Sequence, residues 1–148
     1  MSLTFYCLNG PNLNLLGERE PEIYGKDTLA DLEKISTEAA KEEKSDLVFR
    51  QTNSEGELVD WIQEANRCAN GLIINAAAYT HTSIAIHDAL KTLTIPVIEL
   101  HLSNPSTRES FRKKSYVAPC ADGVIAGFGA LGYRLSVNAI AALARKRS

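Results

Sequence analysis

The sequence predicts an α/β fold, in which a parallel sheet of five strands is covered by helices on both faces. Three observations support this prediction. Short apolar runs suited to strands buried on both faces recur along the chain. The segments between them repeat their apolar residues every three to four positions, as amphipathic helices do. Strands that alternate with helices in this way are typical of parallel sheets.

The predicted strands are the five apolar runs. They are LTFYCL (3–8), LVFRQ (47–51), GLIINA (71–76), PVIELH (96–101) and GVIAGF (123–128). Each has the length and the apolar composition of a buried strand. We therefore expect one strand at each run.

The predicted helices fill the segments between the strands. Apolar stripes follow helical spacing over residues 29–39, 58–65 and 86–93. Ser54 and Glu57 have the spacing of a capping box before the second stripe. Asn104 and Pro105 predict the start of a short helix after the fourth strand. The last helix is expected over residues 135–147, where three basic residues suit its carbonyl end.

The order of the strands follows from the handedness of their connections. Parallel strands are joined by right-handed crossovers, which makes the flavodoxin-like, doubly wound order 2-1-3-4-5 the expected one. In such sheets ligands bind beyond the carboxyl ends of the strands. With 148 residues, 45% of them apolar, the chain is expected to form a single domain over residues 1–148.

Composition and charge argue against several classes of partner. The formal net charge of −2 does not favour a nucleic-acid-binding surface. No apolar run approaches the length of a membrane span, and the first ten residues lack the basic and apolar regions of a signal peptide. The three cysteines show no CxxC spacing, so we expect free thiols in a reducing compartment. These features predict a cytoplasmic protein with no nucleic-acid and no membrane partner.

Motifs for common cofactors are missing from the sequence. No GxGxxG follows the first strand, and there is no Walker A motif or GxSxG elbow. The three histidines, His81, His87 and His101, lack ligand spacing with a carboxylate or cysteine partner, so no metal is expected. Acid–base chemistry without a cofactor remains as the expected activity.

The end of the fourth strand offers an acid–base group. His101 closes this strand, and Glu99 lies two residues earlier on the same face. A carboxylate in a buried strand must be paired, and an imidazole held by a carboxylate is oriented and more basic. A histidine that is hydrogen-bonded at a strand end but has no catalytic role would give the same sequence pattern. Leu102 and Ser103 follow just before a helix start, where backbone amides can bind a carboxylate.

Other polar residues after the third and fourth strands allow two interpretations. Asn75 and His81 can bind ligand hydroxyls, or serve as turn and cap residues. Asp88 lies in the third helical stripe, where a single aspartate is usually solvated. Arg108 and Arg112 are four residues apart and are expected on one helical face, either as a solvent-exposed pair or as an extension of the anion site.

The segment GEREPEIYG (17–25) is expected to be a loop, because Gly17, Pro21 and Gly25 interrupt it. It contains Arg19 and Tyr24. A nearby guanidinium favours a phenolate and lowers the pKa of the phenol, so the two residues can form a base when the loop closes. Loop residues of these types also occur without any such role.

Four segments together resemble the type II 3-dehydroquinate dehydratases, also called type II dehydroquinases. They are LNGPNLNLLGEREPEIYG (8–25), IINAAAYTHTSIAIHDAL (73–90), IELHLSNPSTRESFRKKSY (98–116) and GVIAGFGALGY (123–133). The resemblance covers nearly the whole chain, in order and without insertion. It implies a flavodoxin-like catalytic domain that dehydrates 3-dehydroquinate to 3-dehydroshikimate without cofactor or metal, by anti elimination through an enolate, in the shikimate pathway or in quinate breakdown.

The resemblance also implies roles for the catalytic residues. Tyr24 would be the base, and Arg19 would lower its pKa. Asn12 would help to stabilise the enolate, through a water molecule. His101 would be the general acid that protonates the departing hydroxyl, with Glu99 and Arg108 in supporting positions.

The same resemblance implies how substrate is bound and how subunits assemble. Leu102 and Ser103 would bind the substrate carboxylate. The ring hydroxyls would be held by Asn75, His81 and Arg112. Asp88 would reach the site from a neighbouring subunit, because the family forms trimers that pack into dodecamers. His87 stands where many relatives have arginine, which affects the expected subunit contact.

Two other functions are compatible with the same residues. One is a lyase or isomerase of the same fold that acts on another polyhydroxy keto acid. The other is a non-catalytic module that binds a carboxylate metabolite, which the intact set of Arg19, Tyr24 and His101 disfavours.

Overall fold

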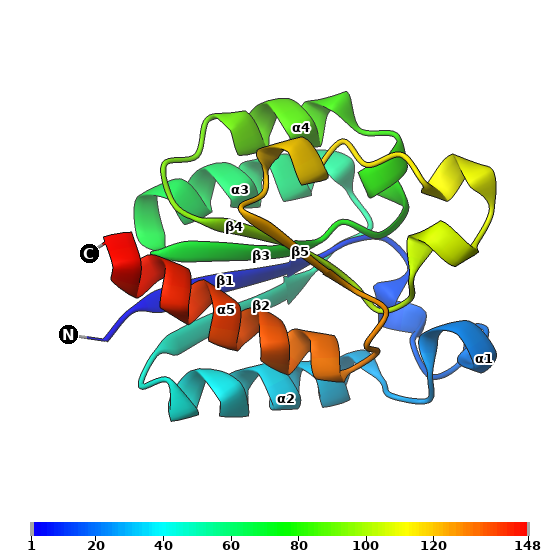
Figure 1. Ribbon diagram of the computed structural model, residues 1–148, viewed down its shortest axis with the longest axis horizontal. Helices are drawn as coiled ribbons and strands as arrows, with labels where there is room; N and C mark the ends of the chain where they lie inside the picture. Colours follow the sequence, from blue (N-terminus) through cyan, green and yellow to red (C-terminus); the bar gives the residue numbers. More distant parts are fainter. Residues whose placement is uncertain (1, 148) are drawn as a thin grey trace.

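The computed structural model describes residues 2–147 and contains a five-stranded parallel sheet between two layers of helices (Figure 1). The strands are β1 (Thr4–Asn9), β2 (Asp46–Gln51), β3 (Gly71–Asn75), β4 (Val97–His101) and β5 (Gly123–Ala126). Their order is β2-β1-β3-β4-β5, and every neighbouring pair is parallel. The predicted flavodoxin-like order is therefore confirmed.

The helices cover the two faces of the sheet in pairs. Figure 1 shows α2 (Leu29–Glu42) and α5 (Leu131–Arg147) on one face, and α3 (Glu55–Cys68) and α4 (Ile84–Lys91) on the other. A further short helix, α1 (Pro21–Tyr24), lies at the end of the molecule to which the strands point. Within residues 2–147 no helix combines the length and the apolar character needed to cross a membrane.

Alternate residues of each central strand face the two layers. Phe5 and Cys7 of β1 join the core under α2 and α5, whereas Tyr6 and Leu8 join the core under α3 and α4. All residues of β3 and β4 are buried, as expected for strands covered on both faces. This expectation is wrong for the two edge strands, since β2 is partly exposed and Val124 of β5 is 53% exposed.

Two helix starts differ from their predictions. Ser54 accepts a hydrogen bond from the backbone of Glu57, which is half of the predicted capping box. A complete capping box instead begins α2, where Thr28 and Asp31 each bond to the other's backbone N–H. The last helix starts at Leu131 rather than near residue 135, because the turn after β5 leads directly into it.

Two predictions about loops are also wrong. Residues 17–25 are not loop throughout, because Pro21–Tyr24 forms one helical turn with proline at its first position. Arg108 and Arg112 do not share a helix, since Pro105–Thr107 and Ser110–Arg112 form two separate 3-10 turns. The predicted cap is present, because the Asn104 side chain accepts from the backbone N–H of Ser106.

The loops that leave β1 and β3 touch each other at the carboxyl edge of the sheet. The N–H of Gly10 donates to the carbonyl of Asn75 over 2.8 Å. A side chain at Gly10 would lie 2.4 Å from the carbonyl oxygen of Ala76, so only glycine fits there. Since the connections from β1 and β3 run to opposite sides of the sheet, this edge is the crevice where ligands bind in such folds.

Candidate active site

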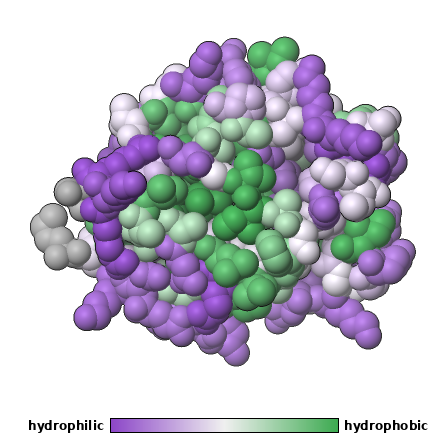
Figure 2. Space-filling model, viewed as in Figure 1, coloured by the Kyte–Doolittle hydropathy of each residue, from purple (hydrophilic) through white to green (hydrophobic). Residues whose placement is uncertain are grey.

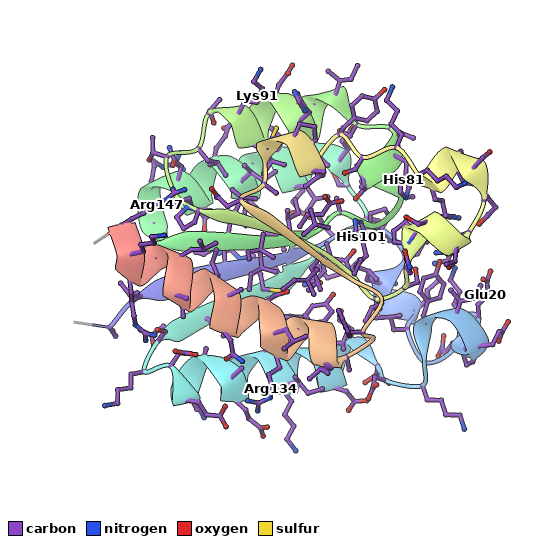
Figure 3. All side chains as sticks on the ribbon, in the orientation of Figure 1. Glu20, His81, Lys91, His101, Arg134 and Arg147 are labelled. Atoms are coloured by element: carbon purple, nitrogen blue, oxygen red, sulfur yellow. The ribbon has the colours of Figure 1, made fainter. Side chains whose placement is uncertain are left out.

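A pocket lies at the carboxyl edge of the sheet and collects most of the predicted site residues. It is formed by the loop after β1 with α1, the turn after β3, and the loop after β4. Figure 3 shows His81 and His101 at this end of the molecule, with Glu20 of the α1 segment farther out at the same end. The predicted residues that line it are Asn12, Arg19, Tyr24, Asn75, His81, His101, Leu102, Ser103, Arg108 and Arg112.

Tyr24 lies between the pocket and the core, with two guanidinium groups over its ring. The Arg19 guanidinium carbon is 4.8 Å from the ring centre, and that of Arg108 is 5.0 Å from it. The ring itself packs against the core under α2 and α5. Cations at this distance are attracted to the face of an aromatic ring. Tyr24 therefore lies in a positively charged part of the pocket wall.

His101 is fixed by the buried carboxylate of Glu99. His101 Nε2 is 2.6 Å from Glu99 Oε2, and the two residues are 8% and 2% exposed. Among the described residues the other ring nitrogen, Nδ1, has no hydrogen-bond partner. The predicted pairing along one face of β4 is therefore confirmed, and Nδ1 is left for a ligand.

Ser115 supplies a second hydrogen-bond partner to the Glu99 side chain. Its oxygen accepts the N–H of Val117 over 3.1 Å and that of Ala118 over 2.9 Å. Its only proton is therefore available for Glu99 Oε2, which is 2.8 Å away. Glu99 Oε2 thus contacts both Ser115 and His101 Nε2, which fixes the orientation of the imidazole.

His81 and Arg112 form the side of the pocket next to His101. The imidazoles of His81 and His101 are stacked with their centres 6.4 Å apart, and His81 Nδ1 bonds to the carbonyl of Lys114 over 2.7 Å. Arg112 pairs with Glu109 over 3.0 Å. The pKa of the Glu109 carboxyl is below its usual value, first because its own backbone N–H donates to it and then because Arg112 does.

The segment after β4 presents backbone donors to the pocket. Leu102 and Ser103 line it, and Arg108 donates to the Ser103 hydroxyl over 3.3 Å. Within residues 2–147 no hydrogen-bond acceptor is found for the backbone N–H of either Leu102 or Ser103. Unpaired amides beside a guanidinium make a site for an anion.

The loop after β1 brings Asn12 to the opposite wall. Asn12 has a left-handed backbone, with φ of 70°, and its N–H donates to the Asn53 side chain over 3.0 Å. Asparagine tolerates this conformation better than most residues. The Asn12 side chain is exposed and lines the pocket.

Comparison with known proteins places nearly the whole chain in one family. The family model described as dehydroquinase class II matches residues 3–141. The chain belongs to the class II dehydroquinases. A 3-dehydroquinate dehydratase from Hyphomonas neptunium is 63% identical over 139 residues, which are 94% of this chain and 93% of the relative. One from Phenylobacterium zucineum is 58% identical and covers 98% of this chain and 100% of its own length.

A solved class II dehydroquinase has the same fold. The crystal structure of type II dehydroquinase from Propionibacterium acnes aligns with a TM-score of 0.92 and 44% sequence identity. The alignment covers 96% of this chain and 98% of the other. The predicted resemblance to this family is thus confirmed.

Two residues predicted for the class II dehydroquinase site are not part of the pocket wall. Glu99 lies behind His101 and reaches the site through it. Asp88 is an exposed residue of α4, and the pocket of its own chain is formed without it. The neighbouring His87 bonds through Nδ1 to the carbonyl of Tyr116 over 2.7 Å.

Two residues behind the pocket wall were missed by sequence reasoning: Ser115, which bonds to Glu99, and Tyr133, which bonds to Asn9 and Asn75. Ser115 follows the fourth strand by more than ten residues and has no motif that connects it to Glu99. Tyr133 is separated from its partner Asn9 by 124 positions. Its only signal in the sequence was a polar aromatic residue in an otherwise apolar position of a helix. Among the described residues no group of three or more His, Cys, Asp or Glu is arranged to hold a metal ion.

Proposed function

We propose that this protein dehydrates 3-dehydroquinate to 3-dehydroshikimate, with Tyr24 as base and His101 as acid, by anti elimination through an enolate. Membership of the class II dehydroquinases and the names of the close relatives support the reaction. One observation carries the assignment of residues. A phenol under two guanidinium groups and an imidazole held by a buried carboxylate line the same pocket.

Tyr24 takes the proton next to the substrate ketone. A proton alpha to a ketone is weakly acidic, and a phenolate is strong enough to remove it. The positive charges of Arg19 and Arg108 favour the phenolate at Tyr24 electrostatically. Asn12 then stabilises the enolate through a water molecule, since developing negative charge is lowered in energy by oriented donors.

His101 supplies the proton that lets the hydroxyl leave as water. Glu99 accepts from Nε2, so the proton that is given away sits on Nδ1 of the imidazolium. The side chain of Glu99, which accepts from Ser115, holds the imidazole so that Nδ1 faces away from it. General acid catalysis of this kind contributes roughly 10²–10⁴-fold.

Substrate is oriented by groups on both sides of these two residues. Its carboxylate binds the backbone N–H groups of Leu102 and Ser103, where the pocket offers unpaired donors. Its ring hydroxyls are held by Asn75, His81 and Arg112. Fixing the ring in this way places the proton and the leaving hydroxyl opposite the base and the acid.

The proposed steps balance without a cofactor or a metal ion. The carbon–hydrogen bond breaks and its proton moves to the Tyr24 oxygen, leaving the enolate. The enolate electrons then form the carbon–carbon double bond, the carbon–oxygen bond breaks, and the hydroxyl takes its proton from His101. A proton returns from Tyr24 to His101 through solvent before the next cycle. The same reaction serves the biosynthesis of aromatic compounds and quinate breakdown.

Asp88 completes the site from a neighbouring subunit in this proposal, within trimers that pack into dodecamers. Asp88 is exposed on α4, and the pocket of its own chain is formed without it. An exposed carboxylate that acts in a pocket must therefore act in that of another copy. His87, beside it, is held by the carbonyl of Tyr116 and alters the details of this contact.

Ultraviolet absorbance after addition of 3-dehydroquinate tests the proposed function, with EDTA present and with protein pretreated with borohydride. The product has a carbon–carbon double bond conjugated to a carbonyl group, and the substrate has none. We expect absorbance to rise equally in all conditions, because neither a metal nor a lysine imine takes part. A flat trace from folded protein would contradict the proposal and favour a module that only binds a carboxylate metabolite. Turnover of a different cyclic keto acid, and not of this one, would assign another substrate.

A further inference from the structure

Three buried polar side chains form a continuous chain of hydrogen bonds beneath the pocket. They are Asn9 at the end of β1, Asn75 at the end of β3 and Tyr133 in the first turn of α5, which are 0%, 3% and 1% exposed. The Tyr133 hydroxyl lies 2.6 Å from Asn9 Oδ1, and Asn75 Nδ2 lies 3.0 Å from the Tyr133 oxygen. Groups buried this completely are costly to leave unpaired.

The two ends of this chain are backbone groups, and these fix the direction of every bond in it. At one end Asn9 Nδ2 is 3.0 Å from the carbonyl of Arg50, which can only accept. At the other end the N–H of Ala77, which can only donate, is 3.2 Å from Asn75 Oδ1. Asn9 must therefore turn its oxygen toward Tyr133, and Asn75 must turn its amide nitrogen toward Tyr133.

Tyr133 is the only one of the three side chains that accepts and donates through a single atom. Its oxygen accepts the proton of Asn75, and its own proton goes to Asn9. A hydroxyl does both at once, whereas an apolar ring does neither. Burial raises the pKa of the Tyr133 phenol, so the hydroxyl keeps the proton that it donates.

We infer that Tyr133 is a positioning residue, which holds Asn75 with its amide N–H groups as the donors so that the second N–H meets an acceptor oxygen of the substrate. Asn75 lines the pocket, and among residues 2–147 its second N–H has no acceptor. The inference rests on the proposed function, because it assigns one substrate contact of that same site. The acceptor belongs to a ring hydroxyl of the substrate, which has lone pairs available.

The backbone at Ala77 agrees with this role. Ala77 has φ of 53°, in the left-handed region that alanine rarely adopts. That conformation keeps its N–H on Asn75 Oδ1. Strained backbone of this kind tends to persist where the surrounding structure fixes a functional group.

Tyr133→Phe tests the inference, with Tyr6→Phe as the matched control. Tyr6 is also buried, at 4% exposed, and its hydroxyl bonds to Glu64 on the face of the sheet under α3 and α4. Both variants lose one hydroxyl, which makes two buried hydrogen bonds in Tyr133 and one partly buried hydrogen bond in Tyr6, so both are expected to unfold at lower temperature. Only Tyr133→Phe is expected to raise KM, by roughly 10-fold with a smaller change in kcat, because a misoriented Asn75 loses a substrate hydrogen bond.

The comparison with Asn75→Ala separates positioning from a structural role. If Tyr133 acts through Asn75, the double variant has the KM of Asn75→Ala alone, since no amide remains to be oriented. A KM for Tyr133→Phe equal to that of the wild type and of Tyr6→Phe would overturn the inference, and so would a double variant whose KM is the product of the two effects. A lower yield of folded protein changes the apparent kcat but leaves KM where it was.

Two further outcomes are distinguishable. If the wild type does not turn over 3-dehydroquinate, the proposed function fails and this inference with it. If the wild type turns over and Tyr133→Phe does not fold, Asn9→Ala carries the same test, because it removes the acceptor of the Tyr133 proton along with the bond from Asn9 to the carbonyl of Arg50, and leaves Asn75 and Tyr133 in place. We then expect a smaller rise in KM than for Asn75→Ala, and an unchanged KM would overturn the inference.

Discussion

At the scale of single residues, Tyr24 and His101 divide the proposed reaction between a base and an acid that are stabilised in different ways. The phenol of Tyr24 is half-buried and lies under the cations of Arg19 and Arg108. The imidazole of His101 is buried and is held by the anion of Glu99. Each neighbour has the charge opposite to that of the reactive form, a phenolate in one case and an imidazolium in the other.

Replacing Tyr24 by phenylalanine is expected to keep the fold and to lower kcat by at least 100-fold, since only the reacting oxygen is lost. Steady-state kinetics on 3-dehydroquinate measure this, and circular dichroism checks the fold. Tyr116→Phe is the control, because Tyr116 lies outside the pocket and should keep wild-type turnover. A Tyr24→Phe variant with more than a tenth of the wild-type kcat, a barrier change below about 1.4 kcal/mol, would remove Tyr24 from the role of base.

Replacing His101 by alanine is expected to cost less when the substrate has a better leaving group in place of the hydroxyl. Such a group departs without a proton, so the acid is no longer needed for it. The ratio of kcat values for variant and wild type is compared on the two substrates. His81→Ala serves as control, because His81 lines the same pocket and should lower both activities alike. Equal losses for His101→Ala on both substrates would show that it is not the acid.

The pairing of Glu99 with His101 could be read from the sequence, whereas the contacts of Ser115 and Tyr133 could not. Glu99 and His101 are two positions apart in one strand, and the period of a strand places them on one face. Ser115 reaches Glu99 from a loop 16 positions away, and Tyr133 reaches Asn9 across 124 positions. Contacts of this kind depend on how the elements pack together, and local periodicity contains no information about that.

At the scale of elements, the sheet order was predictable and the active-site segments were not. Strands and crossover helices have regular periods, and the right-handed crossover rule leaves few possible orders. The segment 17–25 has no such period. Gly17 and Gly25 adopt left-handed backbone at its two ends, and Pro21 begins one helical turn between them. The same glycines and proline that predicted a loop also permit this helical turn. The sequence therefore did not distinguish a loop from a turn of helix in this segment.

Helix α2 follows the α1 segment directly, and its capping box is expected to set where the helix begins. Thr28→Ala removes the side-chain acceptor for the N–H of Asp31 and should lower the free energy of unfolding by about 1 kcal/mol. Chemical denaturation measures this difference. Thr28→Ser keeps the hydroxyl and should recover most of the loss. Equal stability of all three proteins would mean that the box does not stabilise α2.

The stability that the Thr28–Asp31 capping box contributes is expected to decrease as pH falls. The pKa of the Asp31 carboxyl is lowered, first by the backbone N–H of Thr28 and then by its side chain. A group whose pKa is lower in the folded state stabilises the protein above its unfolded pKa, and this contribution is lost as pH falls through the folded value. The difference in stability between the wild type and Asp31→Asn should therefore be present at neutral pH and disappear in acid below the usual carboxyl range. A difference that does not change with pH would contradict this assignment.

At the scale of the whole molecule, the surface contains apolar area that one copy leaves uncovered. Figure 2 shows hydrophobic side chains gathered on the face that contains β5 and the start of α5. Val124, Phe128 and Leu131, all more than half exposed, belong to these segments. Apolar surface of this kind is often an interface between proteins. It supports the proposed assembly, for which light scattering should report a mass far above 16.2 kDa.

The proposed place of Asp88 can be tested by combining two inactive variants in one assembly. Asp88→Asn keeps an intact pocket but gives its neighbour no carboxylate, whereas Tyr24→Phe has an inactive pocket but an intact Asp88. In a mixed trimer, a pocket of the first variant beside an Asp88 of the second is complete.

The two variants are co-expressed in equal amounts with different tags, and assemblies that carry both tags are purified. These should regain about a quarter of the wild-type activity, since half of the pockets are intact and half of those have the right neighbour. If Asp88 acted within its own chain, no combination would contain a complete site, and mixing would restore nothing. Mixing the separately purified proteins without subunit exchange is the control, which should stay inactive.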